Sequence, residues 1–138
     1  QNARFTIANF MRMNIMSAFG ALAVGNESLR KEGVRIDKLY GHGGIFKTPK
    51  VAQSLLAAAL DAPVTVMETA GEGGAWGQAV AASYMLNRDE GESLADYLND
   101  KVFSGMSGMT IEPDPADVAG FKTYVERFKH ANAAELAL

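Results

Sequence analysis

Two glycine-rich stretches are the residues of this chain most suited to binding chemistry. The first, GHGGIFKT, covers 41–48, and the second, AGEGGAWG, covers 70–77. Glycine is costly in backbone entropy, so such clusters indicate either a tight turn or a ligand that approaches the main chain closely. Free N–H groups at the start of a helix bind anions, and each stretch precedes a helix-like segment. A phosphate site and a plain strand-to-helix turn both remain open for each stretch, and neither matches the Walker or GxGxxG pattern.

The segments around the first stretch predict a helix, a strand and a second helix. Apolar residues recur at steps of three and four from Phe5 to Lys31, which predicts one long, largely buried helix. Its methionines, Met11, Met13 and Met16, are interpreted as core filler. Alternation over 34–40 predicts a short strand that ends at the glycines.

The second helix is expected to run from the first glycine stretch to about Leu60. Thr48 occupies a favourable N-cap position, and Pro49 suits the first helical turn. A β-branched strand follows over 64–68, and the second glycine stretch then leads into a third helix. Two parallel strands would bring both glycine stretches to the same edge of a sheet, which favours one shared ligand.

The last third of the chain has weaker signals. We expect a short helix over 91–100, a loop over 104–120 and an amphipathic terminal helix over 121–137, for which Asp114 offers an earlier N-cap. Two parallel strands are too few for a stable sheet. Either a further strand lies within 106–113, or strands outside this chain complete the sheet.

Length and composition indicate a single globular domain of 138 residues with a net charge of −3. This charge offers no basic surface for nucleic acid, so no nucleic-acid partner is expected. The absence of cysteine excludes disulfides, thiolate metal sites and Cys nucleophiles. The chain has no leader-like start and no uninterrupted apolar run long enough for a bilayer, so no membrane partner is expected. It starts at Gln1, and we expect a soluble piece of a longer protein.

Other polar residues near the glycine stretches have structural interpretations. His42 is expected to be packed rather than catalytic, and a His-based metal site is disfavoured because His130 lies far away in sequence. Glu68 and Glu72 could reach Mg²⁺ through water, but we interpret them as solvated or structural. Trp76 is expected to pack the third helix onto the sheet.

Taken as an ordered set, these residues resemble the C-terminal domain of the FGGY carbohydrate kinases, which are actin-like ATPases, with ribulokinase- and xylulokinase-type enzymes nearest. The similarity covers roughly residues 5–86. Gly43, Gly44 and Ile45 stand on the Gly-Gly-small turn of the family, and Thr48 and Gln53 stand on its two polar positions. The later elements are matched by DAPV at 61–64 and AWGQA at 75–79, and Arg12 matches a frequent Arg in the preceding helix.

The resemblance implies an α/β fold: the C-terminal half of an actin-like, ribonuclease H-like ATPase lobe. A long helix is followed by strand, helix, strand and helix, and the sheet is incomplete in this fragment. Residues 1–138 would be a C-terminal nucleotide-binding domain. Gly43 and Gly44 would contact the phosphates and ribose of ATP, and Ile45, Lys47 and Thr48 would border the adenine.

The implied activity is transfer of the ATP γ-phosphate to a sugar hydroxyl, with Mg²⁺ and with a ribulose- or xylulose-type pentulose as substrate. The catalytic Asp and most sugar contacts would lie in an N-terminal lobe that is missing here, so this chain would contain no catalytic and no metal-binding residue. We expect it to be inactive alone. A cytoplasmic location and a possible homodimer belong to the same interpretation. The alternative is a non-catalytic actin-like module that holds nucleotide or a partner.

Overall fold

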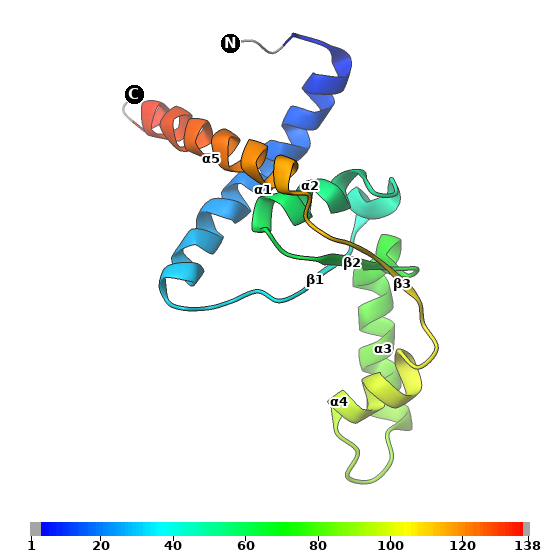
Figure 1. Cartoon of the computed structure of the whole chain (residues 1–138). Coiled ribbons are helices and arrows are strands. Elements are labelled where there is room, and N and C mark those ends of the chain that lie inside the picture. The colour runs from blue at the N-terminus through cyan, green and yellow to red at the C-terminus, as the bar shows by residue number, and fades with distance from the viewer. Residues whose placement is uncertain (1–3, 137–138) are drawn as a thin grey trace.

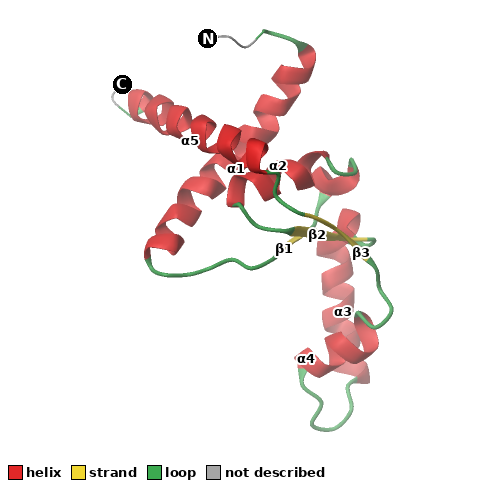
Figure 2. Ribbon diagram, in the orientation of Figure 1, coloured by secondary structure: helices red, strands yellow, loops and turns green. Residues whose placement is uncertain are grey.

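The computed structural model describes residues 4–136 and shows an α/β arrangement with short connecting turns (Figures 1 and 2). In chain order, the elements are α1 (Ile7–Lys31), β1 (Leu39–Gly41), the 3₁₀ turn η1 (Gly44–Lys47), α2 (Val51–Leu60), β2 (Val64–Met67), the 3₁₀ turn η2 (Ala70–Glu72), α3 (Gly73–Asn87), α4 (Leu94–Tyr97), the π-helical turn η3 (Leu98–Val102), β3 (Gly108–Ile111) and α5 (Pro115–Glu135).

The three strands form one sheet in the order β1-β2-β3. β1 and β2 are parallel, with Leu39 opposite Val64, and α2 is the crossover between them. β3 pairs with β2 in the antiparallel direction. The expected α/β fold is therefore confirmed, and a further strand does lie within 106–113.

Helices lie on both faces of this small sheet. In Figure 1, α1 and α5 cross each other above the sheet with α2 at the crossing, and α3 lies below it. Val64 is fully buried in the cluster that joins the sheet to α1, α2 and α5. Thr65 points to the opposite face, toward α3. The main core is thus on one face only, and its buried members are Phe19, Ala23, Ala52, Leu55, Leu56, Ala57, Ala58, Leu60, Val64, Phe121 and Val125.

Gln53 is the polar residue that joins the helical layer to the sheet. Its side chain is only 2% exposed, and its Nε2 donates hydrogen bonds to the carbonyl oxygens of Val64 and Met109, both at 2.7 Å. One amide on α2 therefore contacts both β2 and β3. Buried carbonyls that lose such a donor are costly, so this side chain fixes where α2 lies on the sheet.

α1 is helical as predicted, but the prediction that it is largely buried is wrong. Its buried residues lie between Phe19 and Asn26, where α2 and α5 cross it. Side chains over 4–14 are exposed, including Met11 and Met13, and only Met16 packs against the core. The apolar periodicity indicated a helix correctly. It could not indicate how much of that helix has a packing partner within residues 4–136.

Length and composition would also allow α1 to cross a membrane. Its most apolar 18-residue window has a mean hydropathy of 1.3, and 17% of that window is buried. Core helices of globular domains and signal sequences share these properties. The absence of a membrane partner therefore stays a prediction.

Two local predictions around the sheet need correction. The strand expected over 34–40 is limited to Leu39–Gly41, because pairing with β2 begins only at Leu39. The N-cap of α2 is Lys50 rather than Thr48, because Thr48 is the extended residue that ends η1 and α2 begins only at Val51. Lys50 makes no side-chain capping bond and has a φ of 68°.

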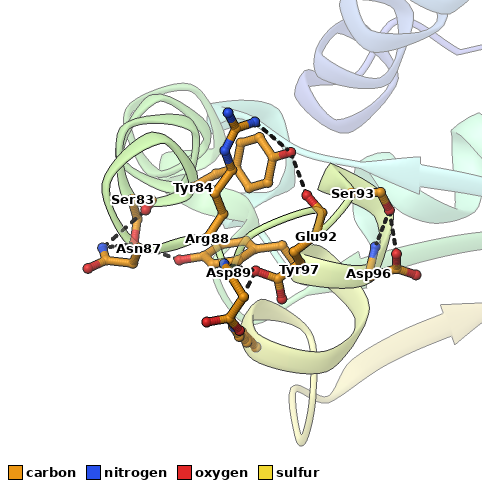
Figure 3. A network of polar contacts seen from close by, with 10 residues as sticks. Ser83, Tyr84, Asn87, Arg88, Asp89, Glu92, Ser93, Asp96 and Tyr97 are labelled. Atoms are coloured by element: carbon orange, nitrogen blue, oxygen red, sulfur yellow. Dashed lines mark hydrogen bonds and ion pairs between the residues drawn. The ribbon is translucent and has the colours of Figure 1, made fainter.

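Capping residues and side-chain hydrogen bonds define the elements in the C-terminal third of the chain. Asp114 caps α5 by accepting hydrogen bonds from the N–H groups of Ala116 and Asp117, which confirms the earlier of the two expected starts. α4 is tied to α3 by the network in Figure 3, where the hydroxyls of Ser83 and Tyr97 are 2.8 Å apart. The Tyr84 hydroxyl donates to the carbonyl oxygen of Glu92 at 3.0 Å. These bonds hold the end of α3 and α4 together as a hairpin.

We predict that Gln53→Leu lowers the free energy of unfolding by about 2 to 4 kcal/mol, because two buried carbonyls lose their donor. The matched control is Gln78→Leu on the exposed side of α3, for which we expect a change within about 0.5 kcal/mol. Urea denaturation followed by circular dichroism measures both values. Equal effects of the two substitutions would show that the amide does not hold α2 on the sheet.

Candidate functional site

The two glycine stretches meet at the carboxyl edge of β1 and β2. The N–H of Gly43 donates to the carbonyl oxygen of Ala70 at 2.6 Å, and η1 packs against η2. This contact confirms that the loops after two successive strands lie side by side. In open α/β sheets this edge is where ligands bind. We therefore take the paired loops, residues 41–48 and 69–73, as the candidate site and refer to them as the loop pair.

The glycines of the first loop serve different purposes. Gly43 has a φ of 103° and a ψ of 174°, a conformation essentially restricted to glycine. At Gly41, a Cβ would lie 2.7 Å from the ring of Phe46, so this glycine makes room for packing. Gly44 has neither constraint: among the described residues, an added Cβ there would meet no heavy atom within 4 Å. Gly44 therefore leaves open space on the surface of the turn.

Lys47 links the first loop to the second. Its Nζ lies 2.6 Å from Oε1 of Glu72, and its hydrocarbon chain crosses Gly71. A Cβ on Gly71 would lie 3.3 Å from Lys47 Cε, so the glycine lets the chain lie close to the second loop. The hydrogen bond and charge of Lys47 hold the pKa of the Glu72 carboxyl below its ordinary value of 4.5. The carboxylate therefore stays ionised at neutral pH.

His42 and Glu68 lie at the edges of the two loops. A Cβ on Gly73 would lie 2.9 Å from that of His42, so His42 stands beside the start of α3, but the residue is exposed and the prediction that it is packed is wrong. Glu68 accepts a short hydrogen bond from the Ser107 hydroxyl. With Glu72 paired to Lys47, both acidic residues have structural partners. Within residues 4–136, no three His, Asp or Glu side chains gather in a way that could hold a metal ion.

A recess of about 700 Å³ extends from the loop pair between α3 and the face of the sheet that points away from the main core. Its wall includes the loop-pair residues Gly41, His42, Thr69, Ala70 and Gly73, and Lys38, Thr65 and Thr110 from the strand side. Trp76 faces this recess and lies 5.7 Å from the ring of Phe103, centroid to centroid. Trp76 therefore packs α3 against Phe103, which follows η3, and the prediction that it packs α3 onto the sheet is wrong, because the recess lies between Trp76 and the strands.

The residues proposed from the sequence for nucleotide contact fall on one short turn. Gly44, Ile45 and Lys47 belong to η1, Gly43 precedes it and Thr48 follows it. Ile45 is 40% exposed and Thr48 is also exposed, so both can be reached by a ligand. The structure thus brings all five together at the loop pair. The pairing of Glu72 with Lys47 was not predicted from the sequence. A basic and an acidic residue in two facing glycine loops were the signal that could have suggested this pair.

Comparison with known proteins agrees with this geometry. No curated protein and no solved structure gives a significant match. The family model described as "FGGY family of carbohydrate kinases, C-terminal domain" matches residues 1–86, which include the loop pair and nearly all of α3. That family has an actin-like ATPase fold, in keeping with the α/β order and the small sheet seen here. The chain belongs to the FGGY family of carbohydrate kinases and carries sequence of its C-terminal domain.

Proposed function

We propose that this chain is the nucleotide-binding lobe of an ATP-dependent carbohydrate kinase and that the loop pair holds the nucleotide. The observation that carries the proposal is the open space at Gly44, on a turn at the carboxyl edge of two parallel strands. Open space beside a glycine does not by itself indicate a ligand, since Gly25 in α1 has it too. At Gly44 it coincides with the carboxyl edge of two parallel strands, where ligands bind, and a ligand that lies against the main chain explains both. Family membership makes a nucleotide the fitting ligand.

In this proposal each residue of the turn has a physical task. Gly43 gives the backbone the conformation that starts η1, and Gly44 lets the phosphates or ribose approach the main chain. Ile45, Lys47 and Thr48 border the adenine. The reaction moves the γ-phosphate of ATP to a sugar hydroxyl, which mainly requires positioning of the reactants and stabilisation of charge.

The remaining parts of the reaction are assigned outside this chain. An Asp that takes the proton from the sugar hydroxyl, and most sugar contacts, would come from an N-terminal lobe. Mg²⁺ would neutralise phosphate charge, but Glu68 and Glu72, the carboxylates in and next to the second loop, are paired with Ser107 and Lys47 and do not form a site for it.

Two features support packing partners beyond this chain. Within the described residues, β1 pairs on one edge only. The first part of α1 exposes apolar side chains such as Phe5 and Ile7, which are 91% and 77% exposed. We propose that further strands extend the sheet at β1 and that the same missing part covers α1. A ribulose- or xylulose-type substrate, a cytoplasmic location and a homodimer are further proposals that rest on the resemblance.

We predict that Gly44→Val raises the KM for ATP about tenfold in the two-lobe enzyme, since the side chain takes space that the nucleotide needs, and leaves the KM for the sugar within about twofold. The fold should be kept, because the added atoms meet open space. In contrast, Gly43→Ala should lower the free energy of unfolding by about 1 to 3 kcal/mol, because φ is positive there.

The matched control is Gly25→Val on the exposed side of α1, where an added Cβ also meets open space among the described residues. It should change neither KM value. If Gly44→Val raised both KM values equally, the loop pair would not be the nucleotide site.

We further predict that residues 1–138 alone bind ADP but do not phosphorylate any sugar, because one lobe cannot align ATP, the sugar hydroxyl and the base. A coupled assay for ADP release against pentuloses, pentoses, polyols and gluconate measures this for the chain alone and for the two-lobe enzyme. Sugar-dependent turnover by the chain alone would contradict the location of the base. A two-lobe protein that binds nucleotide without turnover would support the non-catalytic module instead.

A further inference from the structure

Lys47 occupies a particular place on the proposed nucleotide site. Residues three apart in a 3₁₀ turn lie on the same face, and η1 begins at Gly44 and ends at Lys47. The Lys47 side chain therefore stands beside the surface that Gly44 leaves open. It then runs across Gly71 of the second loop, with Cγ, Cδ and Cε all within 3.9 Å of the position that a Cβ on Gly71 would take.

The ammonium group at the end of the Lys47 side chain already has an acidic partner. Its Nζ contacts Oε1 of Glu72 at 2.6 Å, and the hydrogen bond and charge of Lys47 lower the pKa of that carboxyl. The two side chains are 57% and 76% exposed. An ion pair this exposed gives little stability, so its contribution to the fold does not explain it.

We propose that Lys47 and Glu72 form a charge-neutral strap across the loop pair, in which the hydrocarbon stem of Lys47 contacts the uncharged part of the nucleotide. Glu72 is then a positioning residue. It holds the stem against Gly71 and keeps the ammonium group away from the phosphates. The strap and the hydrogen bond from Gly43 to Ala70 join the two loops at separate points.

This inference rests on the proposed nucleotide site and makes a distinct claim about it. A free lysine near ATP would act as a cation on the phosphates, so its importance would grow with the number of phosphate groups. A stem held by Glu72 contributes through apolar contact, which is the same for a nucleoside and for its phosphates. A series of ligands with the same base and different charge therefore distinguishes a phosphate-binding Lys47 from a Lys47 that contributes apolar contact.

The experiment titrates the ¹⁵N-labelled chain with adenosine, ADP and ATP, and dissociation constants are taken from amide chemical shifts. The variants are Glu72→Gln alone and two that keep the pair uncharged: Lys47→Met with Glu72→Gln, which keeps a stem without charge, and Lys47→Ala with Glu72→Gln. We expect the double variant with Lys47→Ala to weaken all three ligands by about fivefold, the effect of losing the contact of about one methylene group. The double variant with Lys47→Met should weaken all three by a smaller factor that is equal across the series, because neither leaves an unpaired charge beside the ligand.

Glu72→Gln should act in opposite directions on charged and uncharged ligands. Loss of the anchor weakens adenosine, while the released ammonium attracts phosphate, so the ratio of the adenosine and ATP dissociation constants should rise about threefold. Separately, Lys47→Met should bring the pKa of the Glu72 carboxyl back up toward 4.5, as measured by carboxyl-carbon NMR. The control is Lys101→Met in η3, where the same substitution removes a 2.6 Å pair with Asp89 away from the loop pair. It should change no dissociation constant.

The strap is overturned if the two double variants, Lys47→Met with Glu72→Gln and Lys47→Ala with Glu72→Gln, behave alike and their losses grow from adenosine through ADP to ATP, since Lys47 would then be a phosphate-binding cation. It is also overturned if Glu72→Gln weakens ATP more than adenosine. A failure of the nucleotide site itself appears differently, because none of the three ligands would then shift the amides of the loop pair in the unaltered chain.

Discussion

The parallel pairing of β1 and β2 is the constraint on which the candidate site depends. Parallel neighbours end at the same edge of a sheet, so the loops that leave Gly41 and Met67 must emerge together. The connection between the two strands consists of η1 and α2, and the amide of Gln53 fixes the position of α2 on the sheet. A buried side chain with no access to ligand thus determines where the exposed glycines lie.

The residues that match the family pattern separate into distinct physical roles. Gln53 is buried and joins layers, and Gly43 is required by its positive φ. Gly44 is constrained by neither the backbone nor its neighbours in the described part of the chain. A family pattern therefore mixes residues that form the site with residues that contact a ligand, and only the latter should affect binding without affecting stability.

Much of this arrangement was predictable from local sequence signals. The order of helices and strands followed from apolar periodicity and β-branched runs, and the start of α5 followed from the cap at Asp114. The side-by-side placement of the loops followed from the parallel connection. The predictions that failed concern features that depend on contacts between residues far apart in the sequence. Nothing in the periodicity of α1 indicates which of its turns contact α2 and α5. The local sequence at Thr48 favoured an N-cap, but in the structure Thr48 ends η1 instead.

The pairing of Lys47 with Glu72 joins residues 25 positions apart, so the sequence could suggest it only through the side-by-side placement of the two glycine loops. The measurement that tests the central claim most directly is the map of amide chemical shifts when the 14.7-kDa chain is titrated with ADP. The account predicts saturable shifts concentrated in the loop pair, residues 41–48 and 69–73, with the rest of the chain little changed. Saturable shifts concentrated instead in the part of the recess outside the loop pair, at Trp76, Asn99 and Phe103, or no shifts at the loop pair at millimolar ADP, would contradict it.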